Sequence, residues 1–376
     1  MARGLTAERV RRDLDVVARA GLDLDTFGAE AVESLSRAVP HAAACLATHD
    51  PVTHLITSAR KYGALDGRNE DDHLFGLIEY GGVEPTSFTE LAVAPSPAAG
   101  VHLVTGGDVH RSVRMSELMV PSFGFGDEAR VAFREGGTAW GAVALFRDSG
   151  EAPFTEEEIE FLSSLSTTFA RGIRAGMLCQ LAVAAPPTEI AGPAVVIVGR
   201  DDQILQTSLG IEQRLEEMLA GPVSGDPVAV VSSLVGAARR YARGESVRPP
   251  RARVRAASGM WLVLSASPLT ASGDSAGDVV ITIEEARPPE IVSLVVAAFD
   301  LTPRERDVTQ LVLQGVDTKE IAATLHVSTY TVQDHLKSVF DKAGVRSRRE
   351  LISRIYFDQY VPRMGTELTP SGWFAG

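Results

Sequence analysis

The stretch Val327-Ser-Thr-Tyr-Thr-Val-Gln-Asp-His-Leu336 decides how the last part of this 376-residue chain should fold. Ser328 can cap a helix, because its side-chain oxygen can accept a hydrogen bond from a free backbone N–H of the first turn. Apolar residues follow at helical spacing: Val332, Leu336, Val339 and Phe340. Such a stripe predicts one buried face. Three polar residues lie on the other side of the same predicted helix: Gln333, Asp334 and Lys337.

Three further helix starts surround this stretch. Thr302-Pro-Arg-Glu305 places a capping threonine before a proline at the first helical position and a glutamate that can complete a capping box. Asp317-Thr-Lys-Glu320 and Ser347-Arg-Arg-Glu350 repeat the cap and the glutamate. Local signals therefore predict four short helices in this part of the chain.

The link between the second and third of these helices is short. It comprises Leu325-His-Val-Ser328, and such a turn sets two helices at a steep angle, so that the second can enter the major groove of DNA. Gly315 and Gly344 can end the first and third helices, since glycine readily adopts the left-handed conformation of a helix end. Residues 301–360 are predicted to form an all-α, four-helix helix-turn-helix domain.

Four segments in this order resemble the LuxR-type helix-turn-helix domain: Leu301–Val308, Gly315–Ala322, Val327–Leu336 and Lys342–Leu351. The resemblance implies a sequence-specific regulator of transcription that binds double-stranded DNA and acts on RNA polymerase. It assigns base reading to Gln333, Asp334 and Lys337. It assigns contacts with DNA phosphates to Lys319, Ser328, Thr329, Thr331 and Arg348.

Gln333 departs from the pattern, because members of the family often carry lysine or arginine there. Glutamine can pair with adenine through two hydrogen bonds, and Asp334 can accept a hydrogen bond from cytosine N4. We therefore expect a base preference different from that of lysine-bearing relatives. With one cation fewer, binding should also depend less steeply on salt.

The charge of the whole chain is −13, which by itself argues against a nucleic-acid partner. Residues 301–357 differ, with nine basic and seven acidic side chains. The negative charge thus belongs to the preceding part of the chain. A weakly basic module can bind DNA if its cations share a face.

Breaks in the sequence divide the chain. Residues 182–193 are small and proline-rich, as linkers are, and Arg287-Pro-Pro-Glu290 opposes continuation of a helix. The predicted organisation is multidomain: 1–181, a first sensor domain; 182–193, a linker; 194–286, a second sensor domain; 287–300, a linker or dimerisation helix; 301–360, the helix-turn-helix domain; and 361–376, a C-terminal tail.

Both sensor domains are predicted to be α+β folds with antiparallel sheets. In the first, helices are expected over 6–19 and 25–39, capped by Thr6 and Asp25, with strands over 41–48, 52–57, 129–134 and 138–146. One long closing helix should run from Thr155 to about Leu181, with Glu158 completing its cap. In the second, strands are expected over 194–199, 203–207, 251–258, 261–267 and 278–284, with a helix over 208–219.

The order of elements in the first domain resembles a GAF domain, through the hairpin at Glu135-Gly136-Gly137, Pro153-Phe-Thr155 and the closing helix. Val195–Leu205 resembles part of a PAS-like domain. Both resemblances imply pockets over an antiparallel sheet that hold a small-molecule effector. A predicted wall of the first pocket comprises His110, Arg114 and Met115; a polar surface segment is the alternative reading.

Six of the eight histidines lie between residues 41 and 110, and His41, Cys45 and His49 would share one face of a continuous strand. A haem or metal site is thus one alternative, since imidazole and thiolate are suitable ligands. The close ligand spacing typical of such sites is missing, so we expect no cofactor or metal. Cys45 is then a small buried apolar residue.

A homodimer is expected because two modules on two half-sites share one binding event. Two apolar stripes are candidates for the interface: Ile159, Phe161, Leu162, Leu165, Phe169 and Ile173 in the closing helix, and Ile291, Leu294, Val295 and Ala298 after residue 287. Two well-separated cysteines fit a reducing cytosol, and neither a signal peptide nor a membrane span is predicted.

The sequence leaves two other functions as alternatives. An enzyme with a DNA-binding tail would need catalytic residues; no Gly-x-Ser-x-Gly, P-loop, dinucleotide fingerprint or zinc-protease helix occurs, so we expect none. A phosphorylation-driven response regulator would need a parallel βα receiver, and hairpins are predicted instead. A ligand-responsive, cytoplasmic, homodimeric regulator that does not meet a membrane is the preferred reading.

Overall fold

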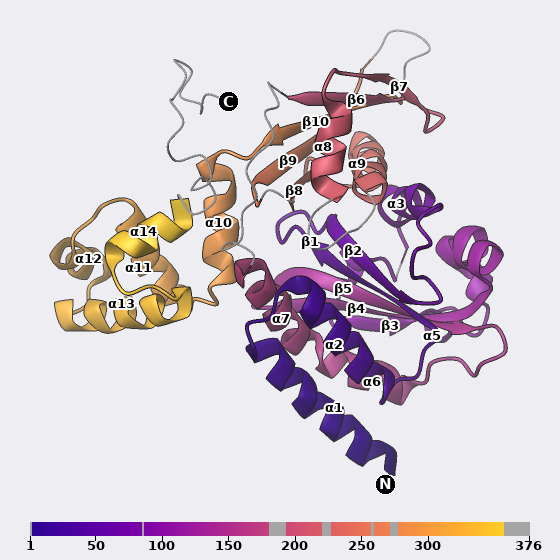
Figure 1. Cartoon of the computed structure of the whole chain (residues 1–376), viewed down its shortest axis with the longest axis horizontal. Coiled ribbons are helices and arrows are strands. Elements are labelled where there is room, and N and C mark those ends of the chain that lie inside the picture. Colours follow the sequence, from indigo (N-terminus) through magenta and orange to yellow (C-terminus); the bar gives the residue numbers. More distant parts are fainter. Residues whose placement is uncertain are drawn as a thin grey trace. The chain divides into compact units, whose positions relative to one another are not determined.

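A computed structural model describes residues 2–84, 86–179, 193–219, 227–256, 259–270 and 277–356. The chain forms two compact units (Figure 1). The larger one comprises Met1–Gln180 and Thr188–Glu285, and the smaller one Leu181–Pro187 and Ala286–Gly376. Most of the predicted linker at 182–193 and the whole predicted tail at 361–376 lie outside the described residues. No helix in the described ranges is long and apolar enough to cross a bilayer.

The first sheet of the larger unit has five antiparallel strands in the order β2-β1-β5-β4-β3. These strands are β1 (Ala43–His49), β2 (Ile56–Gly63), β3 (Ala98–Gly100), β4 (Phe125–Glu135) and β5 (Thr138–Asp148). The hairpin predicted between β4 and β5 is confirmed, since Gly136 and Gly137 take φ values of 58° and 81° in its turn. Residues with side chains rarely adopt such angles.

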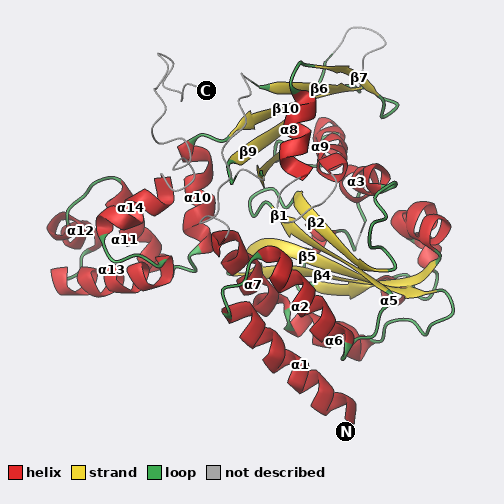
Figure 2. Cartoon of the chain, viewed as in Figure 1, coloured by secondary structure: helices red, strands yellow, loops and turns green. Residues whose placement is uncertain are grey.

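Helices cover both faces of this sheet (Figure 2). One face carries α1 (Ala2–Arg19), α2 (Leu24–Ser36), α6 (Glu156–Ser164) and α7 (Ser166–Cys179). The connection between β2 and β4 forms α3 (Asp72–Gly81), α4 (Phe88–Leu91), β3, α5 (Val101–Val104), η1 (Val109–Arg111) and η2 (Met115–Phe123). In this connection, α3 and η2 lie over the opposite face. The segment η2 is a wide helix with i→i+5 hydrogen bonding.

Several predicted boundaries in this region were wrong. The helix α1 begins at Ala2, so Thr6 lies inside it, and α2 is capped by Asp23, whose side chain accepts from the N–H of Thr26, rather than by Asp25. The second strand lies at 56–63 rather than 52–57. The cap is the residue at which the chain enters the helix. Asp23 and Asp25 are equally suitable as cap residues by type, so the sequence does not distinguish them.

The closing helix is capped by Thr155 and Glu158 as predicted, but it breaks at Leu165 into α6 and α7. Ser166 explains the break. Its hydroxyl donates to the carbonyl oxygen of Ala132 at 2.7 Å and accepts from the N–H of Arg134 at 3.0 Å. The helix is therefore tied to β4 at the place where the register of that strand shifts.

The second sheet has the strand order β7-β6-β10-β9-β8, again antiparallel. Its elements are β6 (Ala194–Val198), β7 (Ile204–Thr207), α8 (Ile211–Leu219), α9 (Pro227–Ala242), β8 (Arg251–Arg255), β9 (Trp261–Pro268) and β10 (Val279–Glu285). All five predicted strands and the predicted helix are present. No helix had been predicted over α9, whose residues are mostly small or apolar.

The two sheets belong to one unit because α3 and α9 pack closely. A Cβ on Gly236 would lie 2.8 Å from the backbone nitrogen of Gly81, so only a glycine allows this approach. A buried ion pair also joins the sheets: Asp50 accepts from the Nε and Nη2 atoms of Arg253 at 2.7 and 2.8 Å. One apolar core extends from Leu55 and Tyr80 into the second sheet.

The smaller unit is helical, as predicted. It comprises α10 (Pro288–Ala298), α11 (Pro303–Leu313), α12 (Thr318–Leu325), α13 (Thr329–Ala343) and α14 (Arg348–Tyr356). The capping box at Thr302 and the caps at Asp317 and Ser328 are confirmed. Gly315 and Gly344 end α11 and α13 with φ values of 84° and 65°. The chain thus has two antiparallel sheets with helices, followed by a helical region.

Candidate nucleic-acid interface and ligand cavities

The turn between α12 and α13 is built by local hydrogen bonds. His326 ends α12 in the left-handed conformation, with φ at 55°, and the N–H of Val327 returns to the carbonyl oxygen of Ala322 at 3.0 Å. Ser328 then starts α13, and its hydroxyl accepts from the N–H of Thr331 at 3.0 Å. These bonds fix the direction in which α13 leaves α12. The link has the helix-turn-helix form expected from its length.

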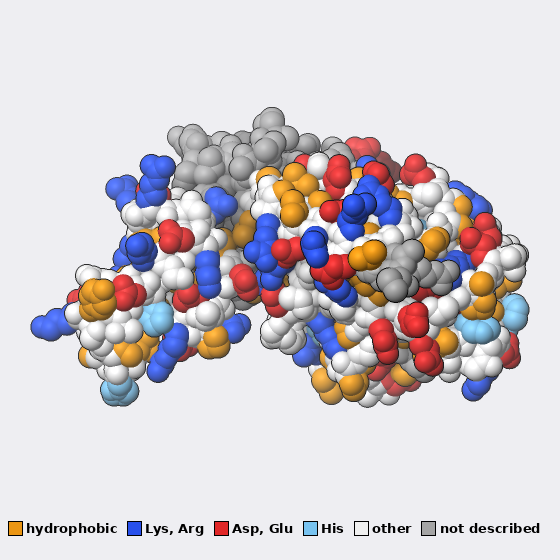
Figure 3. Space-filling view, turned by 90° about the horizontal axis from the view of Figure 1, so that it is seen from below, with side chains coloured by type: hydrophobic (Ala, Val, Ile, Leu, Met, Phe, Trp, Pro, Cys, Tyr) orange, Lys and Arg blue, Asp and Glu red, His pale blue; other side chains and the backbone are white. Residues whose placement is uncertain are grey.

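One face of α13 packs inward and another is exposed. Val332 and Val339 are fully buried and Leu336 is 8% exposed, which confirms the predicted stripe, while Phe340 is half-buried. Three side chains on the other face are exposed: Gln333, Asp334 and Lys337. Burial of the stripe orients this polar face outward. Basic side chains are spread over the visible surface of the helical unit (Figure 3).

The residues predicted to hold phosphates surround the start of α13. Lys319, Ser328 and Thr329 are exposed and Thr331 is half-buried. Arg348 is half-buried, and its guanidinium donates to the carbonyl oxygens of Val316 and, at 3.5 Å, Val312, at the end of α11. The five side chains thus stay predicted DNA contacts, with Arg348 also capping a helix.

Tyr330 was not predicted as a DNA contact, although it is 71% exposed in the first turn of α13. A tyrosine can donate a hydrogen bond to a phosphate oxygen and can pack against the sugar. The sequence could have indicated that Tyr330 is exposed, because position 330 lies outside the apolar stripe of its helix.

Glu305 joins α11 to α13. Its carboxylate accepts from the hydroxyl of Ser338 at 2.6 Å, from Nζ of Lys342 at 2.7 Å and from the N–H of Thr302 at 2.7 Å. Although burial opposes ionisation, the hydrogen bonds from Lys342 and Ser338 lower the pKa of Glu305 to about 2. The ionised side chain holds the second half of α13 in place.

A capped, exposed helix fixed at a short turn defines a class, the helix-turn-helix DNA-binding proteins. Residues 300–355 match the family described as bacterial regulatory proteins, luxR family. The spore germination protein GerE of Bacillus subtilis is 42% identical to this chain over 52 residues, which cover 70% of GerE and 14% of this chain. The chain belongs to the luxR family of bacterial regulatory proteins.

Other relatives share only a small part of their length with this chain. A Mycobacterium bovis protein named as an HTH-type transcriptional regulator, Mb0914c, is 52% identical over 52 residues, which are 14% of this chain and 6% of that relative. A solved structure of the VqmA dimer of Vibrio cholerae is 16% identical and covers 44% of this chain and 81% of that chain. Its TM-score of 0.21 gives no information about the present fold.

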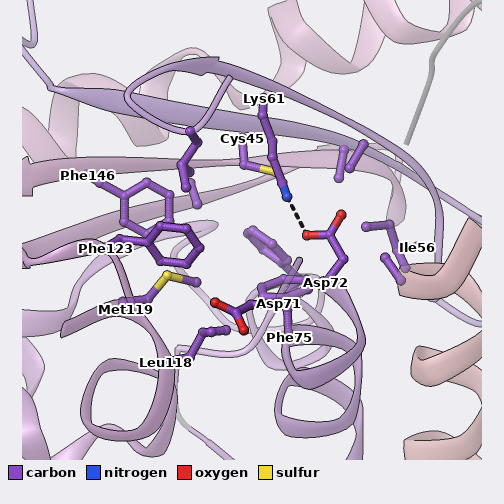
Figure 4. Close-up of a pocket in the computed structure, with 16 residues that line it drawn as sticks. Cys45, Ile56, Lys61, Asp71, Asp72, Phe75, Leu118, Met119, Phe123 and Phe146 are labelled. Atoms are coloured by element: carbon purple, nitrogen blue, oxygen red, sulfur yellow. Dashed lines mark hydrogen bonds and ion pairs between the residues drawn. The ribbon is translucent and has the colours of Figure 1, made fainter. Parts of the chain in front are cut away.

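A small apolar cavity lies over the first sheet, between β1, β5, α3 and η2 (Figure 4). Its volume is about 40 Å³. The rings of Phe123 and Phe146 lie beside Met119 on one side, and the ion pair between Lys61 and Asp72 lies on the other. A water molecule needs at least about 10–15 Å³, so the cavity has room for little more than water or a very small molecule.

The three residues predicted as a ligand-binding wall do not line this cavity. His110 is exposed in η1, whereas Met115 is fully buried in the apolar core. Arg114 is fully buried, and its guanidinium bonds Glu79, Glu84 and Glu128 at 2.7–3.2 Å. These three carboxylates raise the pKa of Arg114 in spite of its burial.

Arg114 belongs to a buried charge cluster that includes Arg130, which bonds Glu79 at 2.9 Å and lies 3.6 Å from the centre of the Phe88 ring. An anionic ligand would have to displace carboxylates to reach Arg114. The wall formed by His110, Arg114 and Met115 stays a prediction.

The histidines do not assemble a metal site among the residues that the structure describes, which hold no group of three suitable His, Cys, Asp or Glu side chains. His41 precedes β1 and its Nδ1 lies 2.8 Å from the carbonyl oxygen of Val39. Burial lowers the pKa of His49 to about 3 and raises that of Cys45 to about 12. Cys45 is half-buried and lines the cavity as a thiol.

Proposed function

We propose that the protein is a sequence-specific regulator in which α13 reads bases and a signal acting on the two-sheet unit controls DNA binding. The exposed polar face of α13 carries this proposal. Gln333, Asp334 and Lys337 project from a helix whose opposite face is buried and whose first turn is capped. Of the described features, only this face combines the helix-turn-helix geometry with side chains suited to base edges.

Selection of binding sites from random duplexes tests base reading. The full-length protein and the variant Gln333→Ala are each used, with Gln310→Ala as a matched control, because Gln310 is an exposed glutamine on α11. Gln333→Ala should relax or change the preference at one base pair, worth about 1–3 kcal/mol in discrimination. Base reading by Gln333 is refuted if both variants select the same sequence as the native protein.

The proposed phosphate contacts are Lys319, Ser328, Thr329, Thr331 and Arg348, which lie at or near the start of α12, α13 and α14. Backbone N–H groups at the start of a helix also attract phosphate. These contacts would set the register of α13 on the duplex without selecting a sequence.

The signal is proposed to act on the larger unit, with a GAF-like first sheet and a PAS-like second sheet. Two antiparallel sheets with helices over them and a cavity over the first support this proposal. All strand pairs among the described residues are antiparallel, so they include no parallel βα receiver of the kind that a phosphorylation-driven regulator needs. The effector would have to bind one arrangement of the chain better than another.

We also propose that the protein is a homodimer, that it acts on RNA polymerase and that it is located in the cytoplasm. Its interface is not assigned to α7, because Phe169 and Ile173 are buried and Phe169 stacks on Phe133 of the same sheet with ring centres 4.5 Å apart. Ile291 and Leu294 of α10 are buried as well. Sedimentation of the native protein with and without a duplex that carries two half-sites tests dimerisation; one monomer per duplex at saturation would refute it.

A further inference from the structure

A second cavity, of about 390 Å³, lies inside the larger unit where the two sheets meet. The part of the chain that forms the first sheet contributes Thr53, His54, Leu55, Tyr80, Thr89, Glu90 and Val93. The part that forms the second sheet contributes Ala237, Arg240 and residues 245–250. Cavities that hold small organic ligands have about 300–1,000 Å³, so this cavity has a suitable size and the one over the first sheet does not.

Hydrogen bonds across the junction keep the walls of the cavity in place. The guanidinium of Arg240 on α9 lies 3.3 Å from the carboxylate of Glu90 on α4. The hydroxyl of Thr53 donates to the carbonyl oxygen of Arg251 at 2.6 Å. Arg248 donates to the carbonyl oxygen of Val52. The site is thus formed before any ligand enters, and this lowers the entropic cost of binding.

Two acidic and two basic side chains line the cavity, and Arg248 is the basic one whose described hydrogen bond does not involve a carboxylate. Glu90 pairs with Arg240, and Glu245 pairs with Arg243 at 2.7 Å. Arg248 is exposed, and within the described ranges its guanidinium donates to a carbonyl oxygen rather than to a carboxylate. His54 adds no charge near neutral pH, because burial and the neighbouring Arg248 lower its pKa.

The remaining lining is mainly apolar. Leu55 and Tyr80 are buried, whereas Val93 and Val247 are 68% and 91% exposed at the rim. Exposed valines on both sides of an opening provide a surface for the body of a ligand. A guanidinium beside such a surface suits a carboxylate, sulfonate or phosphate attached to an apolar group.

We propose that this junction cavity binds a small organic monoanion, with its acidic group on Arg248 and its apolar body against Leu55, Val93 and Val247. Because both sheets contribute to the walls, the occupant would hold them together. The signal that controls DNA binding would act at this cavity. This part of the inference rests on the proposed function. Binding itself does not involve the DNA-binding unit.

Fluorescence titration of the full-length protein with anilinonaphthalene sulfonate, an apolar monoanion, tests this assignment. N-phenylnaphthylamine, which has nearly the same rings and no acidic group, is the matched ligand. Arg248→Gln should weaken binding of the sulfonate at least about tenfold, the effect of losing one charged hydrogen bond, and leave binding of the neutral probe unchanged. Arg248→Lys should restore most of the affinity for the sulfonate.

Two further variants locate the bound probe. Arg68→Gln removes a guanidinium beside Phe123, at the other cavity, and should have no effect. Ala237→Leu fills part of the junction cavity and should weaken binding of both probes, with circular dichroism used to check that the variant is folded. The proposal is overturned if Arg248→Gln and Ala237→Leu bind the sulfonate like the native protein, or if Arg68→Gln alone loses binding. These outcomes need no DNA, so they are distinct from a failure of the proposed function.

Discussion

Glu305→Gln should destabilise the helix-turn-helix unit at neutral pH. The substitution keeps the shape of the side chain and removes the charge that Lys342 and Ser338 bond. The pKa of Glu305 falls from 4.5 to about 2 in the folded protein. Each pKa unit corresponds to about 1.4 kcal/mol, so the ionised carboxylate contributes about 3 kcal/mol to the free energy of unfolding. Its side chain is only 6% exposed, so screening by solvent is limited.

The pH dependence follows from the direction of this shift. Because the folded protein holds the proton more weakly than the unfolded chain, the stabilisation is complete above about pH 4.5 and is lost as the pH falls towards 2. The difference in stability between the native protein and Glu305→Gln should therefore be largest near pH 7 and shrink through that acid range.

Hydrogen exchange followed by mass spectrometry measures the effect in the full-length chain, because peptides from α11 and α13 report on this unit alone. Asp307→Asn is the matched control. Asp307 lies on the same helix and pairs with Arg304 at 3.5 Å, with both side chains at least half exposed, so its removal should change stability by less than about 0.5 kcal/mol. Equal protection of α11 and α13 in the two variants would refute the role given to Glu305.

Three other outcomes are expected. Ser328→Ala removes the cap of α13 and should lower the stability of this unit by about 1 kcal/mol, seen as faster exchange at its first turn. Lys319→Gln should reduce the slope of the logarithm of DNA affinity against that of salt concentration by about one unit; an unchanged slope would exclude a phosphate contact. Gly236→Ala should cost about 1–3 kcal/mol in thermal unfolding of the larger unit, because its Cβ would meet the backbone of Gly81, whereas Gly82→Ala, which meets nothing within 4 Å, should have little effect. Equal melting of the two glycine variants would contradict the close packing of α3 on α9.

Much of the helical unit was predictable because its signals are local. The caps at Thr302, Asp317 and Ser328 each bond backbone groups within three residues. Gly315 and Gly344 adopt the left-handed conformation at their own positions. Helical spacing then showed which side of α13 is buried. For the same reason, the polar residues proposed to meet DNA could be named without coordinates.

Other features of the larger unit depend on distant parts of the chain. The break at Leu165 exists because Ser166 bonds a strand more than thirty positions earlier in the sequence. Arg114 could be named as polar, but its three carboxylate partners come from separate elements, so its burial was not visible in the sequence. The helix α9 is largely buried, and a run of small and apolar residues does not by itself distinguish a buried helix from a buried strand.

The sequence by itself determined the four short helices of this unit, the family and the polar face of α13, because caps, turns and helical spacing act over a few residues. Only the tertiary structure decided the contact of Glu305 with Ser338 and Lys342, the close approach of α3 and α9, and the junction cavity around Arg240 and Arg248. These features join segments that lie 30 to 200 positions apart, and no local pattern encodes which distant side chains will meet.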